Sequence, residues 1–343
     1  MLFLIGLSFI SATFAHPPVC RVQPFDQQCI GSPDPYIVAP SPGKGLGVFA
    51  VHKLETGSII MREAPIIKIK PPHHNPGKGY PTAIISELVN TEYNLLSRDQ
   101  QIEVRSLTYY ISPAEEEYTD KSSLLGLIFR NNAYDTGSEI GLFPKIARIN
   151  HSCRPNAAYY WSEKLQKRII YATRVIQEGE EVFVSFISLL ASREERQKRL
   201  ARYGFVCTCP ACSQHPVDLH QSDESRASIS RAFQAFSTQL TLNIPKSKVG
   251  IRKARKNAES SLQLVDLVQK ESLADYYATA YRIAAISHAR IADWEKAAVW
   301  ANEAYKRRVM EDAGSAWTME MFEMTSMFIE KWQGQLKNKT KPE

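Results

Sequence analysis

The segment RINHSCRPNAAYYW, residues 148–161, places an amide, an imidazole, a hydroxyl and a thiol next to one another. These groups belong to Asn150, His151, Ser152 and Cys153. Four consecutive side chains cannot all point to one place on a helix or a strand. The pattern therefore predicts an irregular loop, and polar groups on such loops commonly serve a ligand or a metal. A surface turn is the alternative, because the same residues have typical turn composition.

A second segment, CTCPAC, has the spacing C-x-C-x-x-C. Its three cysteines are Cys207, Cys209 and Cys212. Three thiolates this close can reach one zinc ion, and tetrahedral zinc requires a fourth ligand. The spacing excludes neither His215 nor His220. Cys153 is the stronger candidate, because thiolate-only sites are common for structural zinc and this cysteine has no other predicted role.

The composition indicates a globular protein. The chain has 343 residues, which is enough for two domains or for one large domain with an appendage. Hydrophobic residues make up 44% and charged residues 23%, so the chain is not typical of disorder. The net charge of +6 is mild, and much of it lies in residues 193–202 and at the C-terminal end. A solvated helix face explains that charge better than a direct nucleic-acid interface.

The first residues suggest a secretory leader. Residues 1–15, MLFLIGLSFISATFA, are apolar and end with Thr13 and Ala15 at positions that a signal peptidase accepts. The run is too short to span a membrane, and no other apolar run reaches spanning length. We therefore expect a cleaved signal peptide and an extracellular protein, with the nucleus or cytoplasm as the alternative. In an oxidising compartment Cys20 and Cys29 could form a disulfide in the Pro-rich arm, residues 16–35.

Alternating apolar residues predict strands in two regions. Residues 36–51 predict two strands around a Gly-rich turn at residues 43–47, and residues 57–71 predict further strands. Later in the chain, RIIYATRVI and EEVFVSFI flank the turn QEGE, which predicts a hairpin.

Helical spacing covers most of the remaining chain. Residues 83–110 predict a helix that is broken near Ser97, a plausible N-cap. LLGLIFRNNAYD predicts a buried helix, and REERQKRLARYGF predicts a charged helix leading to the cysteine cluster. Residues 224–332 predict a helical domain, in which two helices joined near residues 292–293 resemble a tetratricopeptide-type hairpin.

Five segments together resemble the SET-domain family of protein lysine methyltransferases. In chain order they are GKGLGVFA, NAYDTG, RINHSCRPN, GEEVFVSF and CTCPAC. The last resembles the family's post-SET zinc motif, and the helical C-terminus is similar to that of the SET–MYND branch. The zinc-binding MYND insert of that branch is absent, because residues 61–124 contain no cysteine. The resemblance covers about residues 36–213.

This resemblance implies an α+β fold. We expect a β-rich SET fold with a knot-like loop, inserted helices and an α-helical, tetratricopeptide-like C-terminal domain. The corresponding boundaries are residues 1–15 for the leader, 16–35 for the arm, 36–190 for the SET domain, 191–213 for the post-SET zinc segment and 220–335 for the helical domain.

The resemblance also implies the ligands of the site. The methyl donor would be S-adenosylmethionine, bound by Lys44, Gly45, Leu46, Asn132, Asn150, His151 and Phe205. Zinc would be bound by Cys153, Cys207, Cys209 and Cys212. The loop of residues 150–153 would then serve the cofactor with its first two side chains and the metal with its last.

The catalytic positions depart from the family pattern. Phe186 stands where the family usually has its catalytic tyrosine, whereas Tyr203 keeps the second tyrosine position. The family implies an S-adenosylmethionine-dependent protein-lysine N-methyltransferase whose partner is a lysine-bearing protein such as a histone. The alternative is a weakened or inactive SET-fold binding module, in which Phe186 is only a core residue of its strand.

Overall fold

A computed structural model describes residues 34–73, 82–116 and 123–339 of the chain. The predicted leader at residues 1–15, the arm as far as residue 33, and the proposed pairing of Cys20 with Cys29 lie outside the described residues. Within the described ranges, no helix is both long and apolar enough to cross a bilayer.

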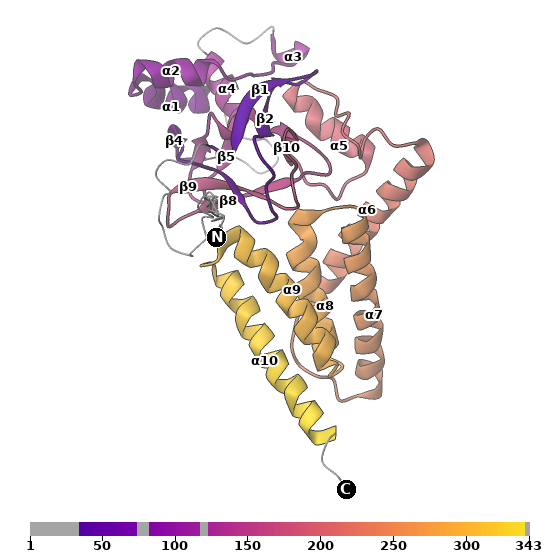
Figure 1. Ribbon diagram of the computed structural model, residues 1–343. Coiled ribbons are helices and arrows are strands. Elements are labelled where there is room, and N and C mark those ends of the chain that lie inside the picture. Colours follow the sequence, from indigo (N-terminus) through magenta and orange to yellow (C-terminus); the bar gives the residue numbers. More distant parts are fainter. Residues whose placement is uncertain (1–33, 74–81, 117–122, 340–343) are drawn as a thin grey trace, which may run out of the picture. The chain divides into compact units, whose positions relative to one another are not determined.

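The protein has an α+β fold, as the sequence predicts (Figure 1). Its strands form three small sheets. The first has the order β1 (Tyr36–Ser41), β2 (Gly45–Ala50), β10 (Glu181–Val184) and β7 (Asn150–His151). The second has the order β3 (Ile59–Glu63), β9 (Lys167–Ala172) and β8 (Ala157–Ser162). The third has the order β4 (Ile67–Ile69), β6 (Ile140–Leu142) and β5 (Ala133–Asp135).

The first two sheets share one apolar core. Side chains from both, including Val48, Ile170 and Val182, are fully buried in a single cluster. Strand side chains alternate between the two faces of a sheet, so the strands contribute every second residue to this core. Phe186, just beyond the end of β10, packs against the edge of this cluster.

The predicted hairpin of RIIYATRVI and EEVFVSFI is wrong. β9 pairs with β3 and β8, whereas β10 pairs antiparallel with β2 and parallel with β7. Between them, Ile176 forms a bridge to Leu54 and thereby leads the chain toward β2. Alternation of apolar residues defines which face of a strand is buried but not which strand lies beside it, so the sequence pattern could not reveal this pairing.

Two local predictions at the site also need correction. Asn150 and His151 form the short strand β7, so irregular backbone begins only at Ser152. The turn before β2 is shorter than predicted, because Lys44 N–H already bonds to the Ser41 carbonyl oxygen at 3.0 Å and Gly45 begins the strand. Pairing of β7 with the distant strand β10, and of β2 with its neighbour β1, extends regular structure into residues that are locally typical of turns.

The helical insert follows β4. It consists of α1 (Thr82–Asn94), α2 (Arg98–Arg105), α3 (Pro113–Glu116) and α4 (Leu124–Asn132). The predicted break at Ser97 is confirmed: its hydroxyl accepts a hydrogen bond from the Gln100 amide, and the Gln100 side chain accepts one from Ser97 N–H. This capping box satisfies amides that the first helical turn leaves unbonded.

A second helical segment follows β10. A charged helix, α5 (Arg193–Leu200), continues as the 3₁₀ turn η3 (Ala201–Tyr203) and ends at Gly204. Gly204 has φ +80°, and a Cβ atom there would overlap the ring of Tyr110. The turn that delivers the cysteine cluster therefore requires glycine for both its backbone conformation and its packing.

Another 3₁₀ turn, η2 (Ile146–Arg148), precedes β7. Glu63 of β3 accepts hydrogen bonds from the amides of Lys145 and Ile146, at 3.0 and 2.8 Å. Burial raises the pKa of this carboxyl to about 7, although the two backbone hydrogen bonds oppose the shift.

The C-terminal region is helical (salmon through orange to yellow in Figure 1). Its elements are α6 (Pro216–Ser237), α7 (Lys248–Lys270), η4 (Ala274–Tyr276), α8 (Tyr277–Ala289), α9 (Trp294–Asp312) and α10 (Ala316–Lys339). The predicted joint between two helices is confirmed, because Asp293 caps α9 and Ala292 has φ +57°. Membership of the tetratricopeptide type remains a prediction.

One apolar cluster joins the cysteine-rich segment to these helices. It includes Cys153, Leu189, Cys212, Ile229 and Phe328. The helical region therefore shares a core with the cysteine cluster, and the boundaries drawn at residues 190, 213 and 220 remain sequence-based predictions.

Candidate functional site

The pairing of β7 with β10 places His151 beside Phe186. The Phe186 amide donates a hydrogen bond to His151 Nδ1 at 3.1 Å, and His151 Nε2 lies 3.4 Å from Cys153 Sγ. Burial lowers the pKa of His151 to about 4, so the imidazole is neutral near pH 7. Because Nδ1 accepts, the ring proton is on Nε2 and points to the sulfur.

Asn150 lies at the centre of a polar cluster. Its Nδ2 donates to the Leu46 carbonyl oxygen at 3.0 Å and to Glu181 Oε1 at 2.7 Å. Glu181 Oε2 accepts from Lys44 Nζ and from Ser41 Oγ, both at 3.0 Å. The structure therefore brings together Lys44, Leu46 and Asn150, three of the residues predicted to bind the methyl donor.

Glu181 is a member of this cluster that the sequence analysis missed. It begins β10, opposite Phe49 of β2, and the sequence analysis took it only as a residue of the strand segment EEVFVSFI. Gly47 makes its position possible, since a Cβ atom there would lie 2.5 Å from Glu181 Oε1. Gly45, with φ +78°, has no atom within 4 Å of where its Cβ would be, so its side of the turn is open.

Asn132 makes its contacts elsewhere. Its Nδ2 donates to the carbonyl oxygens of Thr108 and Ile128, each at 2.8 Å. These bonds tie the end of α4 to the segment after α2. The described structure thus gives Asn132 a role in local folding, and its predicted contact with a methyl donor remains a prediction.

An aromatic cluster continues from His151. The ring centroid of Phe186 is 5.4 Å from that of His151, 5.3 Å from that of Tyr203 and 6.5 Å from that of Phe205. The Tyr203 hydroxyl accepts a hydrogen bond from Arg202 Nη2 at 2.8 Å. The site therefore has an aromatic wall that includes both predicted catalytic positions.

Further aromatic residues, which the sequence analysis missed, extend this wall. Tyr159 donates its hydroxyl to the carbonyl oxygen of Ser185, directly before Phe186, at 3.2 Å. Tyr134 packs edge-on against Tyr159 at 5.4 Å. The guanidinium of Arg168 lies 4.6 Å from the Tyr134 ring centroid and 4.9 Å from that of Tyr159. Tyr159 lies in the segment AAYYW and Tyr134 in NAYDTG, so these two segments held the available signal.

Four cysteines converge behind the aromatic wall. The sulfur atoms of Cys153, Cys207, Cys209 and Cys212 all lie within 4.8 Å of one another. A tetrahedral zinc site with bonds of about 2.3 Å to sulfur would hold its sulfurs about 3.8 Å apart. The 3.7 Å between the sulfurs of Cys212 and Cys153 fits this geometry. Hydrogen bonds from neighbouring thiols, first that of Cys153, hold the pKa of Cys209 well below its usual range.

The two histidines that spacing left open lie outside this group. The described residues contain one such cluster of metal-ligating side chains, and all four members are cysteines. His220 instead pairs with Glu224 on the exposed side of α6, at 3.2 Å. His215 is the N-cap residue of α6.

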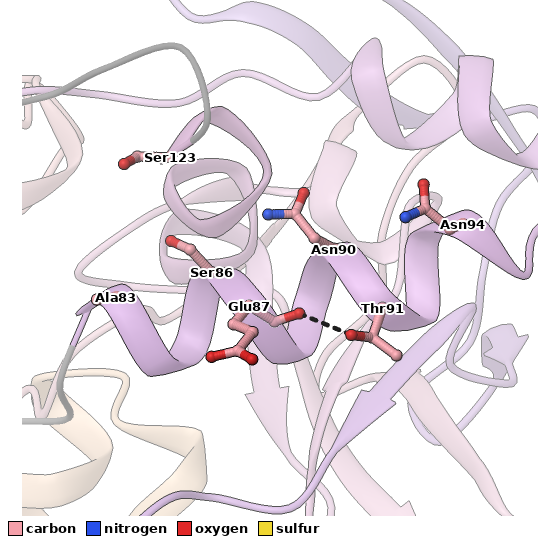
Figure 2. Close-up of a pocket in the computed structure, with 7 residues that line it drawn as sticks. All are labelled: Ala83, Ser86, Glu87, Asn90, Thr91, Asn94 and Ser123. Atoms are coloured by element: carbon pink, nitrogen blue, oxygen red, sulfur yellow. Dashed lines mark hydrogen bonds between the residues drawn. The ribbon is translucent and has the colours of Figure 1, made fainter.

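A separate hollow lies along α1 (Figure 2). Its volume is about 500 Å³, and seven residues from Ala83 to Ser123 line it. Along this helix, Thr91 Oγ1 donates a hydrogen bond to the Glu87 carbonyl oxygen at 3.0 Å. The hollow shares no residue with the Asn150 cluster or the cysteine cluster, and we assign it no function.

Comparison with known families identifies this arrangement. The family model described as "SET domain" matches residues 45–187. The chain carries a SET domain. This SET domain includes Asn150, His151, Cys153 and Phe186, whereas Tyr203 and the other three cysteines follow it.

Relatives of the SET domain include lysine methyltransferases. The histone-lysine N-methyltransferase set5 of Schizosaccharomyces pombe is 30% identical over 179 residues, which are 52% of this chain and 50% of the relative. The N-lysine methyltransferase SMYD2 of Gallus gallus is 32% identical over 143 residues, 39% of this chain and 31% of the relative. That of Rattus norvegicus is 35% identical over 111 residues, 30% of this chain and 25% of the relative. The chain thus spans half or less of the length of these relatives.

Proposed function

We propose that the SET domain transfers a methyl group from S-adenosylmethionine to the side-chain amine of a protein lysine. One observation carries the proposal: the polar cluster around Asn150 lies directly beside the aromatic wall of His151, Phe186 and Tyr203. A methyl transfer needs a polar site for the charged donor next to an apolar site for the acceptor amine. The methyltransferase relatives support the same reaction and a protein substrate, with a histone as one class to test.

The residues present fit a donor that carries an amine and a carboxylate. The Leu46 carbonyl oxygen and the Glu181 carboxylate can accept hydrogen bonds from the amine, and Lys44 can bind the carboxylate. The open side of Gly45 leaves room for the ligand. Phe205, 6.3 Å from the His151 ring, offers an apolar face for the adenine. When bound, the donor supplies an electrophilic methyl group.

The chain's own residues would prepare the acceptor. Only a neutral amine can attack a methyl group, and an apolar aromatic wall disfavours the charged ammonium form. The ring of Tyr203, next to that of Phe186, carries a hydroxyl that can orient the amine, whereas the Phe186 side chain cannot form a hydrogen bond. Alignment of two held reactants then supplies much of the rate.

Phe186 favours a second candidate, a SET-fold binding module with weak or absent transfer activity. Its ring packs against the apolar core and against Tyr203, as a core residue with a purely structural role would. Both candidates use the same donor cluster. They differ in whether methyl transfer follows donor binding.

We also propose that the cysteine cluster binds one zinc ion. The donor set, four buried or half-buried thiols within 4.8 Å, suits tetrahedral zinc. Such an ion would connect the loop after β7 to the segment after η3. Its binding free energy would then be part of the folding free energy of this region.

The decisive experiment is calorimetric titration of the zinc-loaded chain with S-adenosylmethionine, followed by transfer of labelled methyl to a histone and peptide mixture. We expect binding by the wild type and its loss in Asn150→Ala. Asn94→Ala, an exposed change on α1, is the matched control and should bind like the wild type. Absence of donor binding by the wild type would overturn the enzyme proposal. Binding without transfer would favour the binding module.

A further inference from the structure

The start of α7 carries a dense group of positive charges. Six of the eleven residues from Lys246 to Lys256 are Lys or Arg, and no Asp or Glu lies between Glu224 and Glu259 in the chain. All six basic side chains are exposed. This basic cluster consists of Lys246, Lys248, Arg252, Lys253, Arg255 and Lys256.

Nothing in the described part of the chain neutralises the basic cluster, since none of its six side chains has an ion-pair or hydrogen-bond partner there. Lys270, at the other end of α7, does pair, with Asp266 at 2.8 Å. Arg252 lies four residues from both Lys248 and Lys256, a spacing at which like charges destabilise a helix. The first turn also has no acidic residue, although negative charge is favoured at that end of a helix. The arrangement is unfavourable alone and becomes favourable against a negative surface.

The segment between α6 and α7 lies against the same turns of α7. At its start, Asn257 Nδ2 donates a hydrogen bond to Gln239 Oε1 at 2.6 Å. Near its end, a Cβ atom at Gly250 would lie only 2.9 Å from Pro245 Cβ, so these two residues are in close contact. Lys253 is three residues after Gly250 and four before Asn257, so all three share one face of the helix. The segment therefore runs beside the basic cluster.

Exposed apolar side chains accompany these charges. Leu242 and Ile244 of this segment are 41% and 48% exposed, and Val249 in the first turn of α7 is 70% exposed. Val249 is four residues before Lys253, so the two side chains are neighbours on the helix surface. The opposite face of α7 packs into the apolar core. The start of α7 thus presents both positive charge and aliphatic side chains to the solvent.

These features favour an anionic lipid surface over other negative partners. Four of the six basic residues are Lys, a point charge on a flexible stem that needs no fixed partner geometry. No aromatic residue lies between Phe236 and Tyr276, so the region lacks the rings on which bases stack and the aromatic anchors of protein interfaces. Aliphatic side chains beside a basic cluster can enter the headgroup boundary of a membrane, and clusters of about four to eight Lys and Arg are typical of binding to acidic phospholipids.

We propose that residues 242–256 form a peripheral membrane-binding surface for acidic phospholipids. The basic cluster binds the headgroups, and Leu242, Ile244 and Val249 enter the boundary with the acyl chains. No residue of the Asn150 cluster or of the cysteine cluster takes part, so this binding is independent of methyl transfer. It would bring the SET domain to proteins that are held on a membrane.

The first test is co-sedimentation of the full chain with phosphatidylcholine vesicles that contain about 30% phosphatidylserine. We expect binding to these vesicles and none to vesicles of phosphatidylcholine alone. Binding should be lost between about 0.1 M and about 1 M salt, because the Debye length falls from about 10 Å to about 3 Å. A wild type that does not bind the acidic vesicles, or that binds both kinds equally, would refute the proposal.

Charge removal locates the surface. Lys253→Gln combined with Lys256→Gln should bind the acidic vesicles about 25-fold more weakly, since each basic residue near an anionic membrane contributes about fivefold. Lys198→Gln combined with Lys270→Gln is the matched control, because it removes two exposed lysines from elsewhere on the chain. This control should bind like the wild type. An equal loss in both double variants would show that only net charge matters, and the assignment to α7 would fail.

The apolar residues separate a membrane from other polyanions. Leu242→Ser combined with Ile244→Ser should weaken vesicle binding about tenfold, because two aliphatic side chains no longer leave water. Leu95→Ser combined with Ile102→Ser, at side chains that are 77% and 59% exposed, is the matched control and should bind like the wild type. Unchanged binding of the first variant would mean a purely electrostatic surface, which fits a nucleic-acid backbone and contradicts the membrane proposal.

Discussion

Arg226 offers a sharp test of how the helical region supports the site. This residue of α6 is fully buried, and its guanidinium reaches three segments. Nε lies 3.1 Å from Glu271 Oε2, Nη1 donates to the Leu189 carbonyl oxygen at 2.7 Å, and Nη2 donates to the Cys153 carbonyl oxygen at 3.2 Å. The backbone of a predicted zinc ligand is thus held by a residue of the C-terminal helices.

The cost of Arg226→Met follows from what it leaves behind. Removing one partner of a buried ion pair typically costs about 3–5 kcal/mol, because the other charge remains buried. The Glu271 side chain is only 8% exposed, but it keeps a hydrogen bond from Ser222 Oγ at 2.7 Å and a contact with Arg154 at 3.5 Å. We therefore expect a loss near the lower end of that range, about 3 kcal/mol.

Urea unfolding of the zinc-loaded chain, followed by circular dichroism, measures this loss as a change in midpoint. Arg231→Met, an exposed change on the same helix, should alter the free energy of unfolding by no more than about 0.5 kcal/mol. The double variant Arg226→Met with Glu271→Met should recover most of the loss, since no unpaired carboxylate remains buried. A loss below about 1 kcal/mol in Arg226→Met, or no recovery in the double variant, would refute the reasoning.

Three further predictions follow from single positions. Phe186→Tyr should raise the rate of methyl transfer by a few-fold to about tenfold, because one aligned hydrogen bond is worth about 0.5–1.5 kcal/mol. Tyr203→Phe should lower that rate and leave donor binding unchanged. Rates equal to the wild type in labelled-donor assays of both variants would contradict this prediction. Gly43→Ala and Gly204→Ala both place a side chain at positive φ, at a cost of about 1–2 kcal/mol each. Only the Cβ atom at position 204 would also overlap the ring of Tyr110, so the thermal midpoint of Gly204→Ala should fall further. Equal midpoints of the two variants would contradict the packing argument. Burial raises the pKa of the Glu63 carboxyl in the folded protein to about 7, above its unfolded value of 4.5. Between these two pH values the folded state therefore binds more protons than the unfolded state. The free energy of unfolding consequently falls as pH rises through this window. Glu63→Gln should remove that decrease in urea midpoints measured across the window, and an unchanged slope would show that another group causes it.

Local sequence signals predicted much of the fold because they act over a few residues. The capping box at Ser97, the end of α8 near Ala292 and the helix before the cysteine cluster each depend on neighbours within one or two turns. Such signals persist in the chain whatever it packs against. The corresponding predictions are confirmed.

Pairing between distant strands could not be predicted in the same way. Alternation in β9 and β10 indicated two strands but gave no information about their partners, and a hairpin was the wrong choice. Glu181 was missed for the same reason, since its importance comes from contact with Ser41 and Asn150, which are far away in the chain. Asn132 is a further case, a motif residue whose bonds hold the end of α4 to the segment after α2.

By itself the sequence supplied the residue types of the candidate site: three cysteines with the spacing C-x-C-x-x-C, an Asn-His pair and, through the resemblance to the SET-domain family, a phenylalanine where that family usually has a tyrosine. Those are properties of residue types and spacings, and they are readable without coordinates. Only the tertiary structure decided which groups meet. It placed the guanidinium of Arg226 against the backbone of Cys153, because buried charges take partners from whatever segment the packing brings near.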